Sequence, residues 1–187
     1  MTDKNIILDK ALQLGKQTGW ENLSLADTAR VLDIPLVDIY QHFSQKDELV
    51  DAWFDRADRH LLSIRSGPQW LAKPPAQRIE EAVWRWLEAL AEYRHLTGQM
   101  LLYKLEPGHI HLQIGGLLRI SRTVQWLMEV ANLRARHLAR IQQEIALTTV
   151  FVSTFVHWLN DNSEQQHCSR RSLSFKLRTG ALLKIWK

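Results

Sequence analysis

The sequence predicts an all-α fold organised as two helical domains. Apolar residues recur at helical spacing along most of the 187 residues, and no segment shows the alternation of a convincing strand. Two short helices joined by a tight turn are predicted within residues 23–49. Three of the five prolines lie between residues 66 and 75, where they indicate a domain boundary. We therefore expect a first domain over residues 1–64 and a second over residues 65–187.

The first domain should begin with a helix over residues 3–18, which carries a broad apolar stripe. Ser24, with Asp27 three residues later, is close to a capping box at the start of the next helix. Asp33 tolerates the left-handed backbone of a sharp turn, and Pro35 suits the first position of a new helix. The pattern predicts a helix-turn-helix, whose second helix typically enters a DNA major groove.

The remaining helices follow from the same periodicity. Ser44 precedes a helix that should continue to about residue 64 and link the two domains. Beyond the proline-rich boundary, the apolar spacing predicts helices over residues 76–94, 97–105, 110–133, 135–161 and 169–186, with a break at Pro107 and Gly108.

The most specific pattern in the chain is the spacing Ile-Tyr-x-His-Phe-x-x-Lys-x-x-Leu, which runs from Ile39 to Leu49. Together with Leu23-Ser24-Leu25, Ala29 and Ile34, it resembles the N-terminal domain of TetR-type transcriptional repressors. The resemblance covers roughly residues 3–65. It implies a TetR-like, all-α fold, with a three-helix N-terminal helix-turn-helix domain and a helical C-terminal domain for ligand binding and dimerisation.

The same resemblance implies a DNA-binding surface. Phosphate contacts are implied for Ser24, Tyr40, His42 and Lys46, and base contacts for Pro35, Leu36, Val37, Asp38 and Gln41. The family usually has glycine at the turn and cationic or hydroxyl residues on the second helix, which this chain lacks. Residues 1–60 also hold seven Lys or Arg against eleven Asp or Glu, a net charge of −4, whereas residues 61–187 carry +8. DNA binding and a fold retained without DNA binding therefore both remain open.

The second domain is rich in tryptophan and predicts an apolar pocket between its helices. The candidate ligand-binding residues are Trp86, Met100, Leu101, Leu118, Trp126 and Phe155. The alternative for these side chains is an ordinary core together with a dimer surface.

The last two helices are the expected dimer interface, because the family pairs them with those of a second subunit in a four-helix bundle. The candidate interface residues are Val150, Thr154, Trp158, Leu173, Leu177 and Ala181. A twofold dimer would place two recognition helices about one DNA turn apart. The alternative is that these faces pack within one subunit.

The remaining composition favours a regulator over other classes. No paired-carboxylate, glycine-rich or metal-ligand spacing is present, so we expect no enzyme, cofactor or metal site. The single cysteine fits a reducing cytoplasm, and the apolar runs are far shorter than the ~20 residues of a membrane span. We expect a cytoplasmic, homodimeric repressor that binds a double-stranded DNA operator and responds to a small apolar ligand or lipid.

A second class also remains open. Residues 148–187 are loosely similar to lipid-binding proteins of ubiquinone biosynthesis, which use a TetR-like fold. The similarity rests on Trp158, Leu159, Asp161 and Ser163, followed by a pair of arginines. It implies an isoprenoid-binding protein that need not bind DNA.

Overall fold

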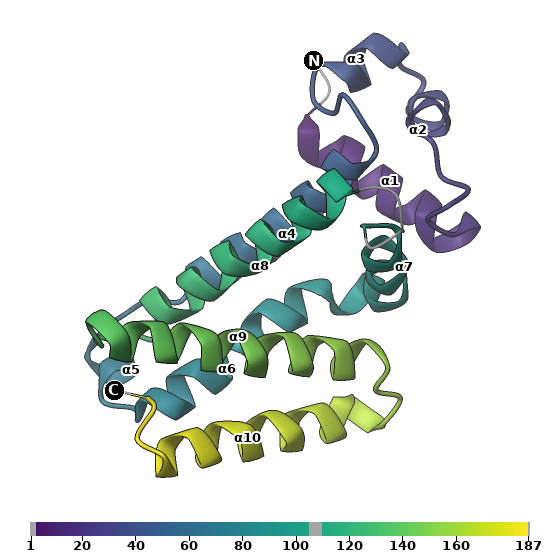
Figure 1. The fold of residues 1–187 in the computed structure, drawn as a ribbon. Helices are drawn as coiled ribbons and strands as arrows, with labels where there is room; N and C mark the ends of the chain where they lie inside the picture. The colour runs from purple at the N-terminus through teal and green to yellow at the C-terminus, as the bar shows by residue number, and fades with distance from the viewer. Residues whose placement is uncertain (1–2, 105–109, 187) are drawn as a thin grey trace. The chain divides into compact units, whose positions relative to one another are not determined.

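The computed structural model describes residues 3–104 and 110–186, and every regular element in these residues is helical (Figure 1). This confirms the predicted all-α fold. The helices are α1 (Lys4–Thr18), α2 (Leu25–Leu32), α3 (Leu36–Tyr40), α4 (Asp47–Leu62), α5 (Pro68–Leu71), α6 (Pro75–Leu90), α7 (Arg94–Lys104), α8 (Ile110–Val130), α9 (His137–Leu159) and α10 (His167–Leu182), with short 3-10 turns at Ala91–Tyr93 and Glu164–Gln166. Within the described ranges, none of these helices combines the length and apolar character of a membrane span.

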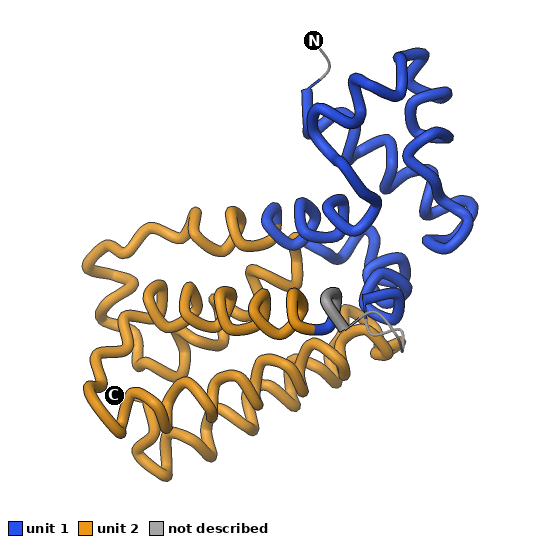
Figure 2. The backbone as a smooth tube through the Cα atoms, turned by 45° about the horizontal axis from the view of Figure 1, so that its top comes forward, with its two compact units in different colours: residues 1–56, 90–113 blue, residues 57–89, 114–187 orange. Residues whose placement is uncertain are grey.

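The chain divides into two compact units (Figure 2). The first joins residues 1–56 to residues 90–113, and the second joins residues 57–89 to residues 114–187. The sequence placed a domain boundary at residue 64, whereas the contacts assign α7 to the N-terminal unit. α7 is therefore part of the structure that supports the predicted helix-turn-helix.

Polar and apolar contacts fix α7 within the first unit. The backbone N–H of Trp20 donates to the Gln99 side chain at 2.7 Å, and the Trp53 indole donates to the buried Thr97 hydroxyl at 2.9 Å. A Cβ at Gly15 would lie 3.1 Å from the side chain of Leu96, so the glycine permits a close approach of α1 and α7. Contacts between residues far apart in the sequence therefore hold the first unit together.

The proline-rich segment is structured. Pro68 occupies the first turn of α5, where its missing N–H costs nothing. The buried Trp70 then donates its indole N–H to the carbonyl of Val130 at 2.8 Å. The segment that the sequence predicted as a domain boundary is thus packed against the end of α8. The predicted break at Pro107 and Gly108 lies outside the described residues.

Asp161 organises the connection between α9 and α10. Its carboxylate accepts hydrogen bonds from the amide and hydroxyl of Ser163 and from the amide and hydroxyl of Ser169, at 2.6–2.9 Å. Burial alone would raise the pKa of Asp161, but these four donors outweigh it and hold the pKa well below the usual range. The carboxylate therefore joins the two helices in its ionised form.

We expect Asp161→Ala to destabilise the protein at neutral pH and to lose this effect in acid. Because the folded state lowers the pKa, the ionised carboxylate contributes its stability above the unfolded pKa of about 3.9 and loses it as the pH falls from there to the lower folded pKa. Urea unfolding of the native chain and the variant at several pH values measures this difference. Glu164→Ala, at an exposed position in the same connection, is the control. A difference that stays constant from pH 7 to acid would contradict the assignment.

Candidate functional site

The helix-turn-helix consists of α2, a left-handed turn and α3. Ser24 caps α2 by accepting the N–H of Asp27 at 3.0 Å, and its hydroxyl donates to the Asp27 carboxylate. That hydrogen bond is the main cause of the lowered pKa of Asp27. Asp33 has φ 54° and ψ 46°, the left-handed conformation expected at this turn. The cap and the turn both follow the sequence prediction.

The start of α3 differs slightly from the prediction. Pro35 was expected at the first helical position, but it has extended geometry (φ −61°, ψ 146°) and precedes the helix, which begins at Leu36. α3 has only five residues and is held by Ile39 and Phe43, both of which are fully buried. These two anchors orient the remaining side chains of α3 outwards.

The exposed face of α3 is apolar and aromatic. Leu36, Val37 and Tyr40 are 52%, 59% and 66% exposed, and Gln41 is exposed beside them. Asp38 and His42 are half-buried at its edge. The sequence therefore selected residues that the structure gathers on one short helix and the residues next to it. A large exposed aliphatic and aromatic surface of this kind typically marks an interaction site.

Lys46 lies against two aromatic rings. Its Nζ is 5.0 Å from the ring centroid of Trp20 and 5.5 Å from that of Tyr103, and it donates to the carbonyl of Glu21 at 3.2 Å. Burial lowers the pKa of Lys46, and the charge of Glu21 opposes that effect. The sequence pattern pointed to Lys46 but not to Tyr103, because α7 contributes that ring from 57 positions further along the chain.

Comparison with solved structures decides the family. A TetR transcriptional regulator from Nitrosomonas europaea is 40% identical to this chain over 96% of it and 98% of the other chain, with a TM-score of 0.84. This chain belongs to the TetR family of transcriptional regulators. A TetR regulator from Rhodococcus sp. RHA1 (TM-score 0.64, 17% identity, 92% and 93% covered) and the multidrug binding protein EbrR complexed with imidazole (0.60, 19%, 92% and 88%) share the fold. No protein-family profile and no curated protein sequence matches the chain.

The candidate ligand-binding residues of this TetR protein do not form one cluster. Trp86 packs edge-to-face on Phe155, with ring centroids 5.3 Å apart, in the core of the second unit. Met100 is buried and Leu101 half-buried on α7, in the first unit. The other two candidates, Leu118 and Trp126, are exposed on α8.

Trp126 lines an open groove of about 670 Å³ in the second unit. The last turn of α4 contributes Leu62, and the following segment contributes Ile64. Two cationic side chains, Arg122 and Arg140, lie at the same groove. One carboxylate, Glu129, lines it as well, so the groove combines an aromatic and aliphatic surface with two cations and one anion.

A buried polar network occupies the interior of the second unit. The Asp58 carboxylate accepts hydrogen bonds from the Trp86 indole at 2.8 Å, from Thr123 at 3.0 Å and from the Arg119 guanidinium at 2.9 Å. All four side chains are at least nine-tenths buried. The sequence analysis missed this network. The signal for it was an aspartate placed on the apolar face of α4, among Phe54, Ala57 and Leu61.

The candidate dimer residues lie mainly inside the protomer. Thr154, Trp158, Leu173 and Leu177 are buried in the chain's own core, Val150 is half-buried, and Ala181 is exposed. These four buried side chains are not available to a partner. Their burial fits the alternative given above for these four positions, in which the two helix faces pack within one subunit.

The opposite faces of α9 and α10 are also apolar. α9 exposes Ile145 and Val156, and α10 exposes Phe175 (72%) and Leu182 (84%). These four residues, which we call the outer face, share helical spacing on each helix. Periodicity could not distinguish the two faces because both carry large apolar side chains.

Proposed function

We propose that this protein is a homodimeric, ligand-responsive repressor that binds double-stranded DNA through α3. The observation that carries the proposal is the exposed face of α3, anchored from behind by two fully buried side chains. A rigidly held short helix with outward side chains after a left-handed turn is the geometry of a recognition helix. Membership of a family of transcriptional regulators supports DNA as the partner of this surface.

The chemistry of α3 determines how it would bind DNA. α3 contains no lysine or arginine, and its outward aliphatic groups, Leu36 and Val37, can contact thymine methyl groups. Asp38 can accept a hydrogen bond from a cytosine amino group. Tyr40, His42 and Lys46 would supply the phosphate contacts, with Ser24 at the start of α2. We therefore propose a protein with few phosphate contacts and a site containing A·T pairs.

The proposed dimer forms through the outer face of α9 and α10. Exposed contiguous apolar surface marks association sites, and two copies of one patch meet around a twofold axis. The proposed interface therefore consists of the exposed residues Ile145, Val156, Phe175 and Leu182. It does not include the buried residues Thr154, Trp158, Leu173 and Leu177.

The proposed ligand site is the groove at Trp126. Its aromatic and aliphatic lining fits an apolar molecule, and its two arginines outnumber the single carboxylate, Glu129, which favours a ligand with a negative charge. Leu62 is the last residue of α4, the helix that begins directly after the helix-turn-helix, so a ligand here would act on that helix. The structurally similar EbrR is a multidrug binding protein, which is consistent with ligand binding on this fold.

Fluorescence anisotropy with the DNA upstream of the protein's own gene and with random duplex DNA tests the proposal. We expect specific binding, with a plot of log affinity against log salt whose slope is below about 4 in magnitude. Each phosphate that a Lys or Arg neutralises contributes about 0.9, and Lys46 is the one such residue among the proposed phosphate contacts of each subunit. Val37→Glu should weaken binding more than about tenfold, because it sets a negative charge against the DNA. An acidic residue at this position is compatible with the first turn of α3.

Leu71→Glu is the matched control, since it adds the same charge at an exposed aliphatic residue of the second unit. Equal loss of binding in both variants would indicate a general charge effect and contradict a recognition role for α3. Absence of any binding at low salt would contradict the DNA-binding proposal for the unliganded protein.

The lipid-binding alternative has less support. Asp161 and Ser163, which carried part of the similarity, are engaged in the hydrogen-bonded connection between α9 and α10. Trp186, in the same stretch of residues 148–187, is buried, and its indole N–H donates to the carbonyl of Leu177 at 2.9 Å. Local packing thus accounts for these residues without a lipid.

A further inference from the structure

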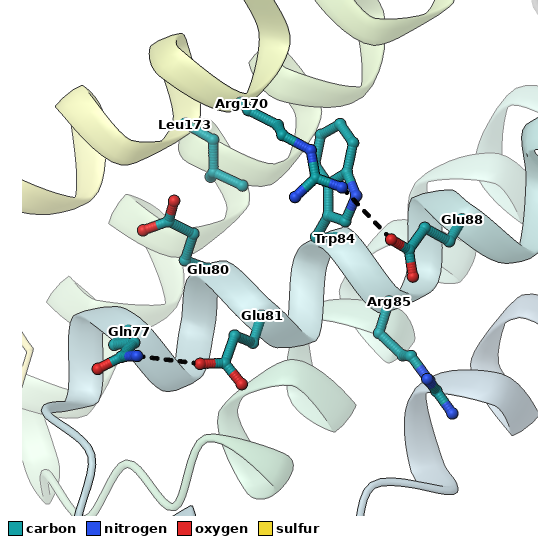
Figure 3. Close-up of a pocket in the computed structure, with 8 residues that line it drawn as sticks. All are labelled: Gln77, Glu80, Glu81, Trp84, Arg85, Glu88, Arg170 and Leu173. Atoms are coloured by element: carbon teal, nitrogen blue, oxygen red, sulfur yellow. Dashed lines mark hydrogen bonds and ion pairs between the residues drawn. The ribbon is translucent and has the colours of Figure 1, made fainter. Parts of the chain in front are cut away.

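A cleft of about 370 Å³ lies between α6 and α10 in the second unit (Figure 3). α6 contributes three carboxylates, Glu80, Glu81 and Glu88, and the ring of Trp84. Residues 80, 84 and 88 are successive positions on one face of a helix, so two of the carboxylates flank the indole. α10 contributes Arg170 and Leu173, and α6 also contributes Gln77 and a further cation, Arg85. None of these residues lines the groove at Trp126.

The Arg170 guanidinium already shows which kind of group fits the cleft. Its central carbon lies 3.9 Å from the centroid of the Trp84 ring, and its Nη2 lies 3.4 Å from a Glu88 oxygen. A planar cation over an aromatic face beside a carboxylate is a favourable arrangement. Both Arg170 and Glu88 are about half exposed, so their ion pair contributes little stability and exchanges readily with solvent.

Trp84 has a further unusual feature. The residue is only 7% exposed, and its indole nitrogen is buried without a hydrogen-bond acceptor. A buried donor without an acceptor is unfavourable and unusual in a folded protein. The Arg170 guanidinium over the ring has no acceptor to offer this N–H, so the cleft leaves the donor unsatisfied.

The carboxylates of the cleft also favour added positive charge. Burial raises the pKa of Glu80, and the cations Arg178 and Arg170 oppose that effect. Glu81 is paired with Lys73 and accepts a hydrogen bond from Gln77. Glu88 has the exchangeable pair with Arg170. An external cation that takes the place of Arg170 therefore lies between the same two carboxylates, on either side of the indole, which favour a positive charge there.

We propose that the cleft between α6 and α10 binds an organic cation of the guanidinium type, and that Arg170 occupies the site from within the chain in its absence. The external cation takes the place of the Arg170 guanidinium over Trp84, between Glu80 and Glu88. The displaced Arg170 side chain moves into solvent. This site is separate from the groove and from α3, and it does not depend on DNA binding.

Isothermal titration of the full-length protein with n-butylguanidinium, and with the neutral isostere n-butylurea, tests the proposal. We expect saturable binding of the guanidinium and none of the urea. Arg170→Ala should strengthen guanidinium binding by about threefold to tenfold, because it removes the internal competitor. Glu88→Gln and Trp84→Leu should each weaken it by about fivefold or more.

Arg171→Ala is the matched control, since it removes the same charge from the next exposed residue of α10, outside the cleft. Four results would overturn the proposal: no binding to Arg170→Ala at millimolar guanidinium, equal binding of the urea, an equal gain in Arg171→Ala, or unchanged affinity in Glu88→Gln. Because Glu88 is a surface residue, its variant remains informative if Trp84→Leu fails to fold. The DNA assay is independent, so either proposal can fail alone.

Discussion

Asp58→Ala is expected to lower the free energy of unfolding by about 3–5 kcal/mol. The substitution removes the carboxylate that Trp86, Arg119 and Thr123 share in the interior of the second unit. The Arg119 guanidinium would stay buried without the carboxylate that neutralises it there, and the indole N–H and the hydroxyl would lose an acceptor. Urea unfolding followed by far-ultraviolet circular dichroism measures the loss.

Two further variants separate the ion pair from simple truncation. Arg59→Ala, at an exposed position one residue further along α4, should change stability by less than about 0.5 kcal/mol. Asp58→Leu combined with Arg119→Met should recover much of the loss, because apolar residues replace both buried charges together. A loss below about 1 kcal/mol in Asp58→Ala would show that the network is not a major source of stability.

Phe175→Asp should convert the proposed dimer to a monomer and, as a consequence, abolish the proposed tight binding to an operator. The residue is exposed on the outer face of α10, and a twofold dimer places two copies of the new charge at one interface. Loss of a central aromatic contact costs about 2 kcal/mol or more, which raises the dimer dissociation constant at least about thirtyfold. Sedimentation velocity measures the oligomeric state directly.

The same substitution at Leu71, an exposed residue on α5, is the control and should leave the dimer intact. Operator binding is then compared for both variants by anisotropy. A Phe175→Asp variant that remains dimeric at micromolar concentration would contradict the outer-face interface. A monomer that still binds the operator with native affinity would contradict the requirement for two recognition helices.

The local features of the helix-turn-helix were predictable because they depend on neighbouring residues. A serine before an apolar run and an aspartate at a left-handed turn are short-range signals, and Ser24 and Asp33 behave as expected. Pro35 shows the usual limit of this reasoning. The residue type predicted a helix start, but its place one position before the helix depends on the turn geometry.

The contacts that join distant segments were not predictable in the same way. Periodicity showed that α9 and α10 are apolar, but α9 has large apolar groups on opposite faces, such as Phe151 inside and Ile145 outside. The pattern alone cannot say which face covers the core. The burial of Asp58 depends on partners 28, 61 and 65 positions away, and no local signal identifies them. The candidate ligand residues show the same limit, since periodicity could not indicate that Met100 and Leu101 lie in the first unit and the other four in the second.

The assignment of α7 to the first unit has a consequence for the order of synthesis. The helix-turn-helix leaves the ribosome before α7, so Trp20 and Trp53 find their partners, Gln99 and Thr97, only after some forty further residues have followed Arg56. Until then the nascent segment lacks part of its own core, including the polar partners of these two tryptophans. The unit that holds the helix-turn-helix is therefore completed only when α7 has been synthesised. An incomplete chain that ends before α7 would carry the recognition sequence without the structure that holds it ready for an operator.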